Sequence, residues 1–384
     1  MRGITELALI SKDKKMRNKR LSISVLLTLI ISISNAQETF FSKFENLQDK
    51  KIIAVGESAH AQLDFASWNI NFFKELVENE ITSVFSLEND YSNSKTLNEF
   101  IQGKYNTTSL DSLMKNNLQG VWQSEVMKDF LLWARQHNMD KLDNKKIRFF
   151  GFDSQCGRCA MKEIIKFIDD EKPDLKKGLS VNGLELLSQI YATSDYNLKK
   201  LPKEDRQLMK ETLNRLNEVF KEEVNSSHKI QIDLLALNHA WEFENANLLN
   251  FTNVRDKNMA IIFEEIIKAQ STPVFMWAHN GHISKSNNSF YKPIGYHLYN
   301  KYKSDYLSIA LDFKTKVNSK TFTDVEDKKW LANDTDFGEN NIKIIKTYRL
   351  GKSTIRDVGA YQHKLKIKND KQFDYIVYFK EIKN

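Results

Sequence analysis

A carboxylate and an imidazole three residues apart form the first pair in this sequence that could do chemistry. They are Glu57 and His60, in the segment KIIAVGESAH at residues 51–60. Histidine takes up a proton near neutral pH, and a neighbouring carboxylate can fix its tautomer and stabilise the imidazolium, as general base catalysis requires. The alternative is a glycine turn whose Glu and His cap a helix or face water.

A strand and a helix are expected on either side of this pair. Residues 52–55 are apolar and are followed by Gly56, as in a buried strand, and the apolar residues of 64–77 have helical spacing. Glu57 and His60 therefore lie on a predicted strand-to-helix turn. In an open α/β sheet, ligands usually bind in the crevice outside the carboxyl ends of the strands.

Three more predicted strands end near polar side chains that could act in the same crevice. The strands span 82–87, 146–152 and 273–277, and the polar residues after them are Glu88, Asp153, His279 and His282. If the sheet is mostly parallel, these strand ends meet at one edge. The sequence therefore predicts a single site that also contains Glu57 and His60.

These elements predict an α/β fold with a mostly parallel central sheet flanked by helices and a large helical insertion. Further strands are expected at 306–313 and 373–379. Residues from about 160 to 267 contain no strand-like run and are rich in long amphipathic stretches, which predicts the insertion. We expect a single domain over residues 37–384.

The composition of the 384-residue chain is ordinary for a globular protein, with 41% apolar residues. Its formal net charge of +7 comes mostly from residues 1–36, which hold seven Lys and Arg side chains and two acidic ones. The charge therefore gives no support to nucleic-acid binding. A serine esterase and a nucleotide enzyme are also disfavoured, because the sequence has no G-x-S-x-G and no glycine-rich phosphate loop.

Residues 1–36 predict a secretory signal peptide. A cationic segment precedes an apolar run over 21–33, and Ser-Asn-Ala at 34–36 is a small-x-small cleavage pattern. Met16 begins a more conventional signal than Met1, so we expect translation to start there. An uncleaved membrane anchor is the alternative, but the apolar run is short for a membrane span. The mature protein is expected to be periplasmic or secreted, with no stable membrane insertion after cleavage.

The only two cysteines, Cys156 and Cys159, form a C-x-x-C pair. In an oxidising compartment they could close a small disulfide; half of a zinc site and two idle thiols are the alternatives. A thioredoxin-like role is disfavoured, because the pair is not expected to open the first helix of a βαβ unit in the usual way.

Six sequence blocks occur in an order and at spacings that match a known family. They are V-G-E-S-A-H at 55–60, L-E at 87–88, L-W-A-R-Q-H-N at 132–138, F-G-F-D-S-Q at 150–155, R-D-K-N-M-A at 255–260 and W-A-H-N-G-H at 277–282. The ordered set resembles the erythromycin esterase family, including its succinoglycan-biosynthesis-like relatives. The resemblance implies an α/β core with a helical part, and hydrolysis of an ester by water without a covalent serine intermediate.

In that family the histidine that matches His60 is held to be the general base, with the acid that matches Glu57 beside it. Further positions of the family's active cleft are matched by Glu88, Arg255, His279 and His282. The best-known members open the macrolactone ring of erythromycin. The resemblance therefore implies a small-molecule ester as substrate, with a macrolide lactone as one option.

The sequence departs from the family pattern around the base. The commoner G-E-x-x-H-G-x-x-E-F has Gly and Glu where this chain has Ala61 and Asp64, and a basic residue often found in the following helix is here Asn69. The pattern R-D-x-x-M-A-x-N ends here on Ile262 rather than Asn. The base and the acid are kept, which favours hydrolysis, whereas the departures weaken the case for a macrolide substrate.

The cationic candidates have more than one interpretation. Arg255 could hold a developing oxyanion, or it could pair with a carboxylate such as Asp256 or Glu88. His279 and His282 could donate to the oxyanion, protonate the leaving alcohol or bind a metal. Glu57 or Glu88 would orient the base.

Asp153, Trp122 and Asn280 are expected to line the substrate pocket; a helix cap for Asp153 and core packing for Trp122 are the alternatives. No cofactor is expected. Two His and two Glu would also suit zinc or manganese, so a metal-dependent hydrolase is a second hypothesis. A third is a non-catalytic, polysaccharide-associated binding protein of the same fold.

The prediction of a cleaved signal peptide can be tested directly. N-terminal sequencing of the exported protein should begin at Gln37, because signal peptidase cuts after a small-x-small sequence. Recovery of an exported chain that retains Leu26 would contradict cleavage.

Overall fold

The computed structural model describes most of the chain. The described residues are 40–190, 198–222, 228–247, 249–287, 291–316, 331, 335–359, 362–368 and 371–383. The predicted signal peptide lies outside them. Residues 46–384 form one compact unit, and residues 1–45, whose described part contains a short 3-10 helix at Phe40–Lys43, form another. No helix in the described ranges is long and apolar enough to cross a membrane.

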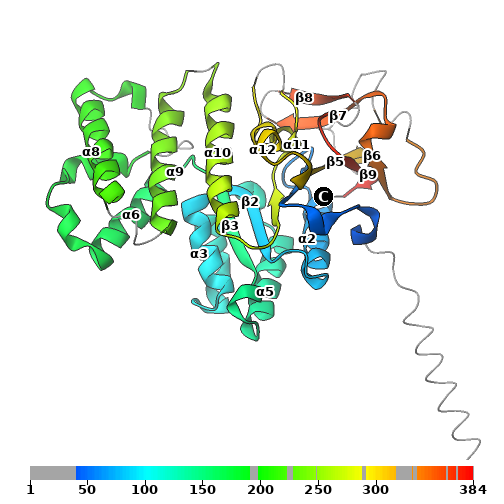
Figure 1. Ribbon diagram of the computed structural model, residues 1–384, viewed down its shortest axis with the longest axis horizontal. Coiled ribbons are helices and arrows are strands. Elements are labelled where there is room, and N and C mark those ends of the chain that lie inside the picture. Colours follow the sequence, from blue (N-terminus) through cyan, green and yellow to red (C-terminus); the bar gives the residue numbers. More distant parts are fainter. Residues whose placement is uncertain are drawn as a thin grey trace, which may run out of the picture. The chain divides into compact units, whose positions relative to one another are not determined.

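A seven-stranded sheet forms the centre of the unit that spans residues 46–384 (Figure 1). Its strands, in sheet order, are β3 (Arg148–Asp153), β2 (Val84–Asp90), β4 (Val274–Trp277), β1 (Ile52–Val55), β5 (Tyr306–Lys316), β9 (Tyr375–Ile382) and β6 (Ile342–Lys346). All neighbours run parallel except β6, which pairs antiparallel with β9. The predicted mostly parallel α/β sheet is confirmed, and the strands expected from the sequence are all present.

Three strands lie where the sequence predicted none. One is β6, and the others, β7 (Lys352–Gly359) and β8 (Gln362–Lys368), form a separate antiparallel pair. Their sequences, such as IKIIK in β6 and QHKLKIK in β8, alternate Lys with apolar residues and so lack a continuous apolar run. Lys on an edge strand also discourages pairing with another chain, which suits the position of β6 at the edge of the sheet.

Helices flank the sheet and make up the insertion (Figure 1). Those outside the insertion are α2 (Leu63–Glu78), α3 (Tyr91–Ile101), α4 (Leu110–Asn117), α5 (Glu125–Met139), α11 (Asn280–Ile283) and α12 (Ile294–Tyr302). The insertion contains α6 (Gly157–Glu171), α7 (Val181–Leu187), α8 (Lys203–Glu222), α9 (His228–Asn245) and α10 (Phe251–Lys268). As predicted, the described residues between β3 and β4 contain helices and no strand.

The last helix of the insertion returns to the sheet. Phe263 of α10 packs edge-on against Phe152 of β3, with ring centroids 5.3 Å apart. The first residues of α10 are thereby carried to the edge of the sheet where the parallel strands end.

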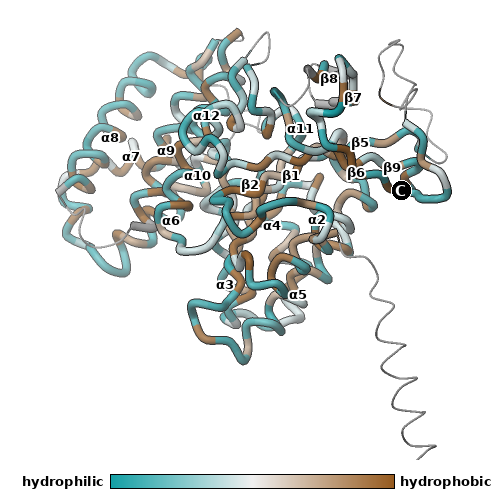
Figure 2. Tube along the Cα trace, turned by 45° about the vertical axis from the view of Figure 1, so that its right-hand side comes forward, coloured by the Kyte–Doolittle hydropathy of each residue, from teal (hydrophilic) through white to brown (hydrophobic). Residues whose placement is uncertain are grey.

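The central strands are apolar because both faces of the sheet are covered. Every residue of β1 and β4 is buried. On one face, the ring of Phe85 in β2 lies 5.0 Å from that of Phe73 in α2 and 4.6 Å from that of Phe130 in α5. Figure 2 shows hydrophobic stretches along the central strands and mainly hydrophilic ones on α8.

The two cysteines form a disulfide at the start of α6. Strand β3 ends at Asp153, and Cys156 is the N-cap residue of α6. The pair therefore opens a helix that follows a strand, and this helix is the first of the helical insertion rather than a single crossover between two parallel strands.

Candidate active site

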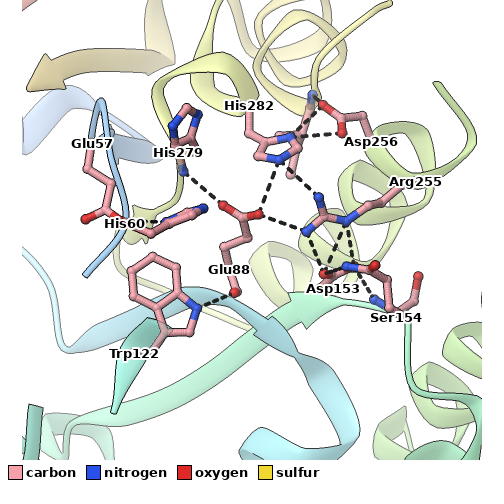
Figure 3. Close-up of polar contacts among 12 residues, drawn as sticks. Glu57, His60, Glu88, Trp122, Asp153, Ser154, Arg255, Asp256, His279 and His282 are labelled. Atoms are coloured by element: carbon pink, nitrogen blue, oxygen red, sulfur yellow. Dashed lines mark hydrogen bonds and ion pairs between the residues drawn. The ribbon is translucent and has the colours of Figure 1, made fainter. Parts of the chain in front are cut away.

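Four neighbouring parallel strands end next to one another on the same side of the sheet. They are β3, β2, β4 and β1, and their carboxyl ends form this side. These strands are consecutive neighbours, and their registers place Val55 and Leu87 both opposite Trp277. Figure 3 shows the polar side chains beyond these ends gathered in one cluster. The cluster contains Glu57, His60, Glu88, Asp153, Arg255, Asp256, His279 and His282. The prediction that the strand ends converge is confirmed.

Glu57 and His60 form a direct pair. Nδ1 of His60 lies 2.6 Å from Oε1 of Glu57, and the indole nitrogen of Trp277 donates to Oε2 of Glu57 at 3.2 Å. The Glu57 side chain is 1% exposed and that of His60 is 29% exposed. Because Nδ1 is bound to Glu57, Nε2 is the imidazole nitrogen that can exchange a proton with a ligand or water.

Burial and mutual contact set the proton affinities of the pair. Burial raises the pKa of Glu57, and the hydrogen bond and charge of His60 offset this only in part. Burial acts in the opposite direction on His60, but the hydrogen bond and charge of Glu57, with the charge of Glu88, outweigh it and raise the pKa of His60 above 6.5. The contacts of His60 thus favour its protonated form, as suits a base that takes up a proton during the reaction.

Trp122 supports the base from one side. It lies in a short 3-10 helix, Gly120–Trp122, and its indole nitrogen donates to the backbone oxygen of Glu88 at 2.8 Å. The ring packs edge-on against His60, with centroids 5.1 Å apart, and it is 3% exposed. Trp122 also lines a small pocket of 90 Å³ beside Glu57. The Trp122 side chain is therefore packed against its neighbours, and it also lines a pocket. Whether that pocket binds substrate stays a prediction.

Arg255, near the start of α10, is held by two carboxylates. Its Nη2 donates to Oε1 of Glu88 at 2.8 Å and to Oδ2 of Asp153 at 2.7 Å, and its Nε is 3.3 Å from Oδ1 of Asp153. These charges raise the pKa of Arg255 although burial acts against it. Of the two interpretations, pairing with a carboxylate is what the geometry shows, and Asp153 is a stronger partner than the sequence indicated.

His282 is held as a cation. Its Nδ1 lies 2.9 Å from each oxygen of Asp256, and its Nε2 lies 3.2 Å from Oε1 of Glu88. Burial alone would lower the pKa of His282, but the charges and hydrogen bonds of Asp256 and Glu88 raise it to about 10. His282 is therefore protonated at neutral pH and does not act as a base there.

Glu88 joins the two cations to the end of β4. Besides Arg255 and His282, it accepts a hydrogen bond from the backbone nitrogen of His279 at 2.9 Å. Burial would raise the pKa of Glu88, but the charges of His282 and Arg255 hold it well below 4.5. Glu88 is thus ionised, and the residue that orients His60 is Glu57.

Asn280 and Asp153 do not face a substrate pocket, so the predictions that they line it are wrong. Asn280 is fully buried, and its amide group bonds to both the backbone oxygen and nitrogen of Leu311, at 2.9 and 3.2 Å. A side chain at Gly56 would come within 2.1 Å of Asn280, which is why only glycine fits there. Asp153 is also fully buried and is bound to Arg255 and to the backbone of Ser154.

Asp256 is the site residue whose role the sequence did not reveal. It is fully buried, holds His282, and also accepts a hydrogen bond from the backbone of Ile294 at 3.0 Å. The sequence offered it only as a partner for the adjacent Arg255. On a helix, consecutive residues point in different directions, so adjacency argues against that pairing.

No group of three or more His, Cys, Asp or Glu side chains in the described ranges is arranged to hold a metal ion. The carboxylates of Glu88, Asp153 and Asp256 are paired with Arg255 or His282, and that of Glu57 is paired with His60.

Comparison with known proteins identifies the family. The model of the family described as Erythromycin esterase matches residues 77–382. The chain belongs to the erythromycin esterase family. Erythromycin esterase type I of Escherichia coli is 23% identical to this family member over 298 residues, which cover 68% of this chain and 71% of that protein.

Solved structures share the erythromycin esterase fold. A succinoglycan biosynthesis protein has a TM-score of 0.74 at 18% identity, covering 88% of this chain and 89% of its own. A mutant erythromycin esterase in its open conformation has a TM-score of 0.62 at 16% identity, covering 88% and 92%. The family match begins at residue 77, after Glu57 and His60, so geometry alone places this pair in the cluster.

At one departure from the erythromycin esterase pattern, the backbone conformation still favours the residue of the pattern. Ala61 has a φ of 57°, in the left-handed region that favours glycine, and glycine is what the commoner pattern has at this position. Ala61→Gly should therefore raise the free energy of unfolding by about 1 kcal/mol, as measured by urea denaturation. Ala66→Gly, inside α2, is the matched control and should lower it by about 1 kcal/mol. Equal effects of the two substitutions would contradict this account.

The protonation of His282 can be followed by NMR. Its ring should stay charged from pH 6 until the pH approaches about 10. Because an unfolded histidine has a pKa of about 6.5, the charged ring stabilises the fold fully below that pH, and this contribution is lost as the pH rises toward 10. The resonance is assigned by its loss in His282→Asn. Titration near pH 6.5 would overturn the assignment of His282 as a cation.

Proposed function

We propose that this protein is an exported hydrolase of carboxylic esters in which His60 activates a water molecule. The observation that carries the proposal is the 2.6 Å contact between Nδ1 of His60 and the buried Glu57, at the edge of the sheet where Arg255 and His282 also lie. Membership of the erythromycin esterase family supports ester hydrolysis as the reaction class.

In the proposed reaction, Nε2 of His60 takes a proton from water as the water oxygen attacks the ester carbonyl. Glu57 stabilises the imidazolium that forms, and this imidazolium then protonates the leaving alcohol. Proton transfer by a positioned side chain of this kind contributes roughly 10²- to 10⁴-fold in rate.

His279 lies beside the proposed base. The centroids of the His279 and His60 rings are 5.0 Å apart, and Nε2 of His279 lies 3.3 Å from the backbone oxygen of Ser58. His279 therefore helps to form the wall of the proposed reaction site next to His60.

Besides pairing with carboxylates, Arg255 and His282 would also stabilise the oxyanion. Arg255 and His282 are only 17% and 12% exposed, and both are already charged before the reaction begins. Preorganised charges in a site that largely excludes water act more strongly on a developing negative charge than they would in solution.

The proposed substrate is a small-molecule ester, and a macrolide lactone is the finer alternative that the Escherichia coli relative's name suggests. Export is proposed from the signal sequence in residues 1–36. The Cys156–Cys159 disulfide supports it, because disulfides persist mainly in oxidising compartments.

The proposal is tested with a panel of carboxylic esters and the purified mature protein. His60→Gln should lower kcat/KM by roughly 10²- to 10⁴-fold, because it removes the base. His137→Gln, in α5 outside the cluster, is the control and should keep the wild-type rate. The rate should rise with pH through an inflection above 6.5, because His60 must be neutral to accept a proton and its pKa is raised.

Other results would favour the other hypotheses. Turnover that is abolished by a chelator and restored by zinc or manganese would indicate a metal-dependent hydrolase. A wild-type protein that is folded yet inactive on every ester would indicate a binding protein. Hydrolysis of erythromycin is evaluated separately, because a lack of activity on this one lactone would not contradict the proposal of ester hydrolysis.

A further inference from the structure

The Cys156–Cys159 disulfide lies where a thiolate would be stabilised. Cys156 is the N-cap of α6, and its sulfur accepts a hydrogen bond from the backbone nitrogen of Cys159 at 3.2 Å. The free N–H groups and dipole at a helix N-terminus stabilise negative charge, and they lower the pKa of thiols placed there. If the disulfide opens, charge on the Cys156 sulfur is therefore favoured.

The two sulfurs differ in access. Cys156 is 3% exposed, whereas Cys159 is half-buried on the first turn of α6. Between them, Gly157 packs closely on Ile190, since a Cβ there would come within 2.8 Å of it. Of the two cysteines, Cys159 is therefore the more accessible to an incoming group.

The charges on this turn suit an anionic partner. Arg158 and Lys162 are both exposed and flank Cys159 on the first turns of α6. The nearest acid along the helix, Glu163, is engaged with Lys95 at 2.9 Å. Reactive cysteines are typically found in such electropositive, partly exposed surroundings.

The buried side chain of Asp90 holds the turn before α6 without placing a full negative charge beside Cys156. Oδ2 of Asp90 accepts the backbone N–H of Cys156 at 3.1 Å, and the Asp90 side chain also caps α3. Burial raises the pKa of Asp90 to about 8, so its carboxyl group is mostly neutral at pH 7. No full negative charge from Asp90 then faces Cys156.

Stabilisation of the fold is a poor explanation for this disulfide. It joins residues three apart in sequence. The stabilisation that a disulfide gives by restricting the unfolded chain grows with the length of the loop it closes, and this loop is among the shortest possible.

We propose that Cys156 and Cys159 form a redox centre that exchanges with exposed thiols, an activity separate from the hydrolytic site. A thiolate attacks the sulfur of Cys159, a mixed disulfide forms, and the Cys156–Cys159 bond breaks with Cys156 leaving as a thiolate. A second thiolate attacks the partner's sulfur and releases Cys159. Two thiols are oxidised to one disulfide, and the protein pair gains two electrons and, with two protons from water, becomes a dithiol.

Single-cysteine variants test which sulfur is attacked. Folded Cys156→Ser, which leaves the thiol of Cys159, should react quickly with the chromogenic disulfide dithiobis(nitrobenzoate). Cys159→Ser, which leaves the buried Cys156, should react at least about tenfold more slowly, because the burial of Cys156 limits access more than its stabilised thiolate helps. Equal rates, or the reverse order, would overturn the proposed direction of attack.

The wild-type protein provides the test that needs no variant. In the first assay, the protein is equilibrated with millimolar glutathione, its free thiols are alkylated, and its mass is measured by mass spectrometry. In the second assay, the protein is tested for catalysis of insulin reduction by dithiothreitol. Reduction by glutathione with no effect on insulin supports exchange with small thiols, and activity in both assays supports protein partners. A disulfide that is reduced only after denaturation overturns the proposal. The Cys156→Ser/Cys159→Ser double variant is the blank for both assays.

Discussion

The ionised carboxylate of Glu88 is the interaction on which the rest of the cluster depends. It receives Arg255 from α10, His282 from α11 and the backbone of His279 beyond β4. Taking a charge out of water is costly unless it is paired, and breaking a buried pair by removing one partner typically costs about 3–5 kcal/mol. Glu88 therefore fastens the last helix of the insertion and the segment after β4 to the end of β2. Without it, Arg255 and His282 would each lose one of the two carboxylates that they contact.

This ion-pair network gives two histidines of the same cluster different properties. His60 contacts Glu57, whose own pKa is raised by burial, and the hydrogen bond and charge of Glu57, with the charge of Glu88, raise the pKa of His60. His282 lies between Asp256 and Glu88, and its pKa rises to about 10. The environment thus distinguishes His60, which has one imidazole nitrogen bound to Glu57, from His282, which carboxylates hold as a cation through both nitrogens. Pairs of titratable groups whose pKa values are driven apart are typical of sites that perform acid–base chemistry.

Much of the fold followed from local sequence, because buried parallel strands are continuous apolar runs and each was followed by its polar residue. The partner choices within the cluster did not follow. Arg255 and Asp153 are 102 residues apart, and nothing in local spacing shows that they meet. Asn280 stands between two cluster histidines, yet its side chain turns into the sheet toward Leu311. Which side chains pair depends on how the strands and helices pack together in the complete fold. The Lys-rich strands such as β6 were not predicted, because they lack a continuous apolar run.

The position of β1 in the sheet has a consequence for how this chain reaches its native state. Although β1 is the first strand among the described residues, it pairs with β4 and β5, and Ile52 meets its partner only at Val274. Pairing between strands that are far apart in sequence is slow, because the long chain segment between them loses conformational entropy before the strands make any stabilising contact. The nascent polypeptide therefore carries an unpaired, wholly apolar segment while more than two hundred further residues are added. During that interval the segment is a target for aggregation and for chaperones.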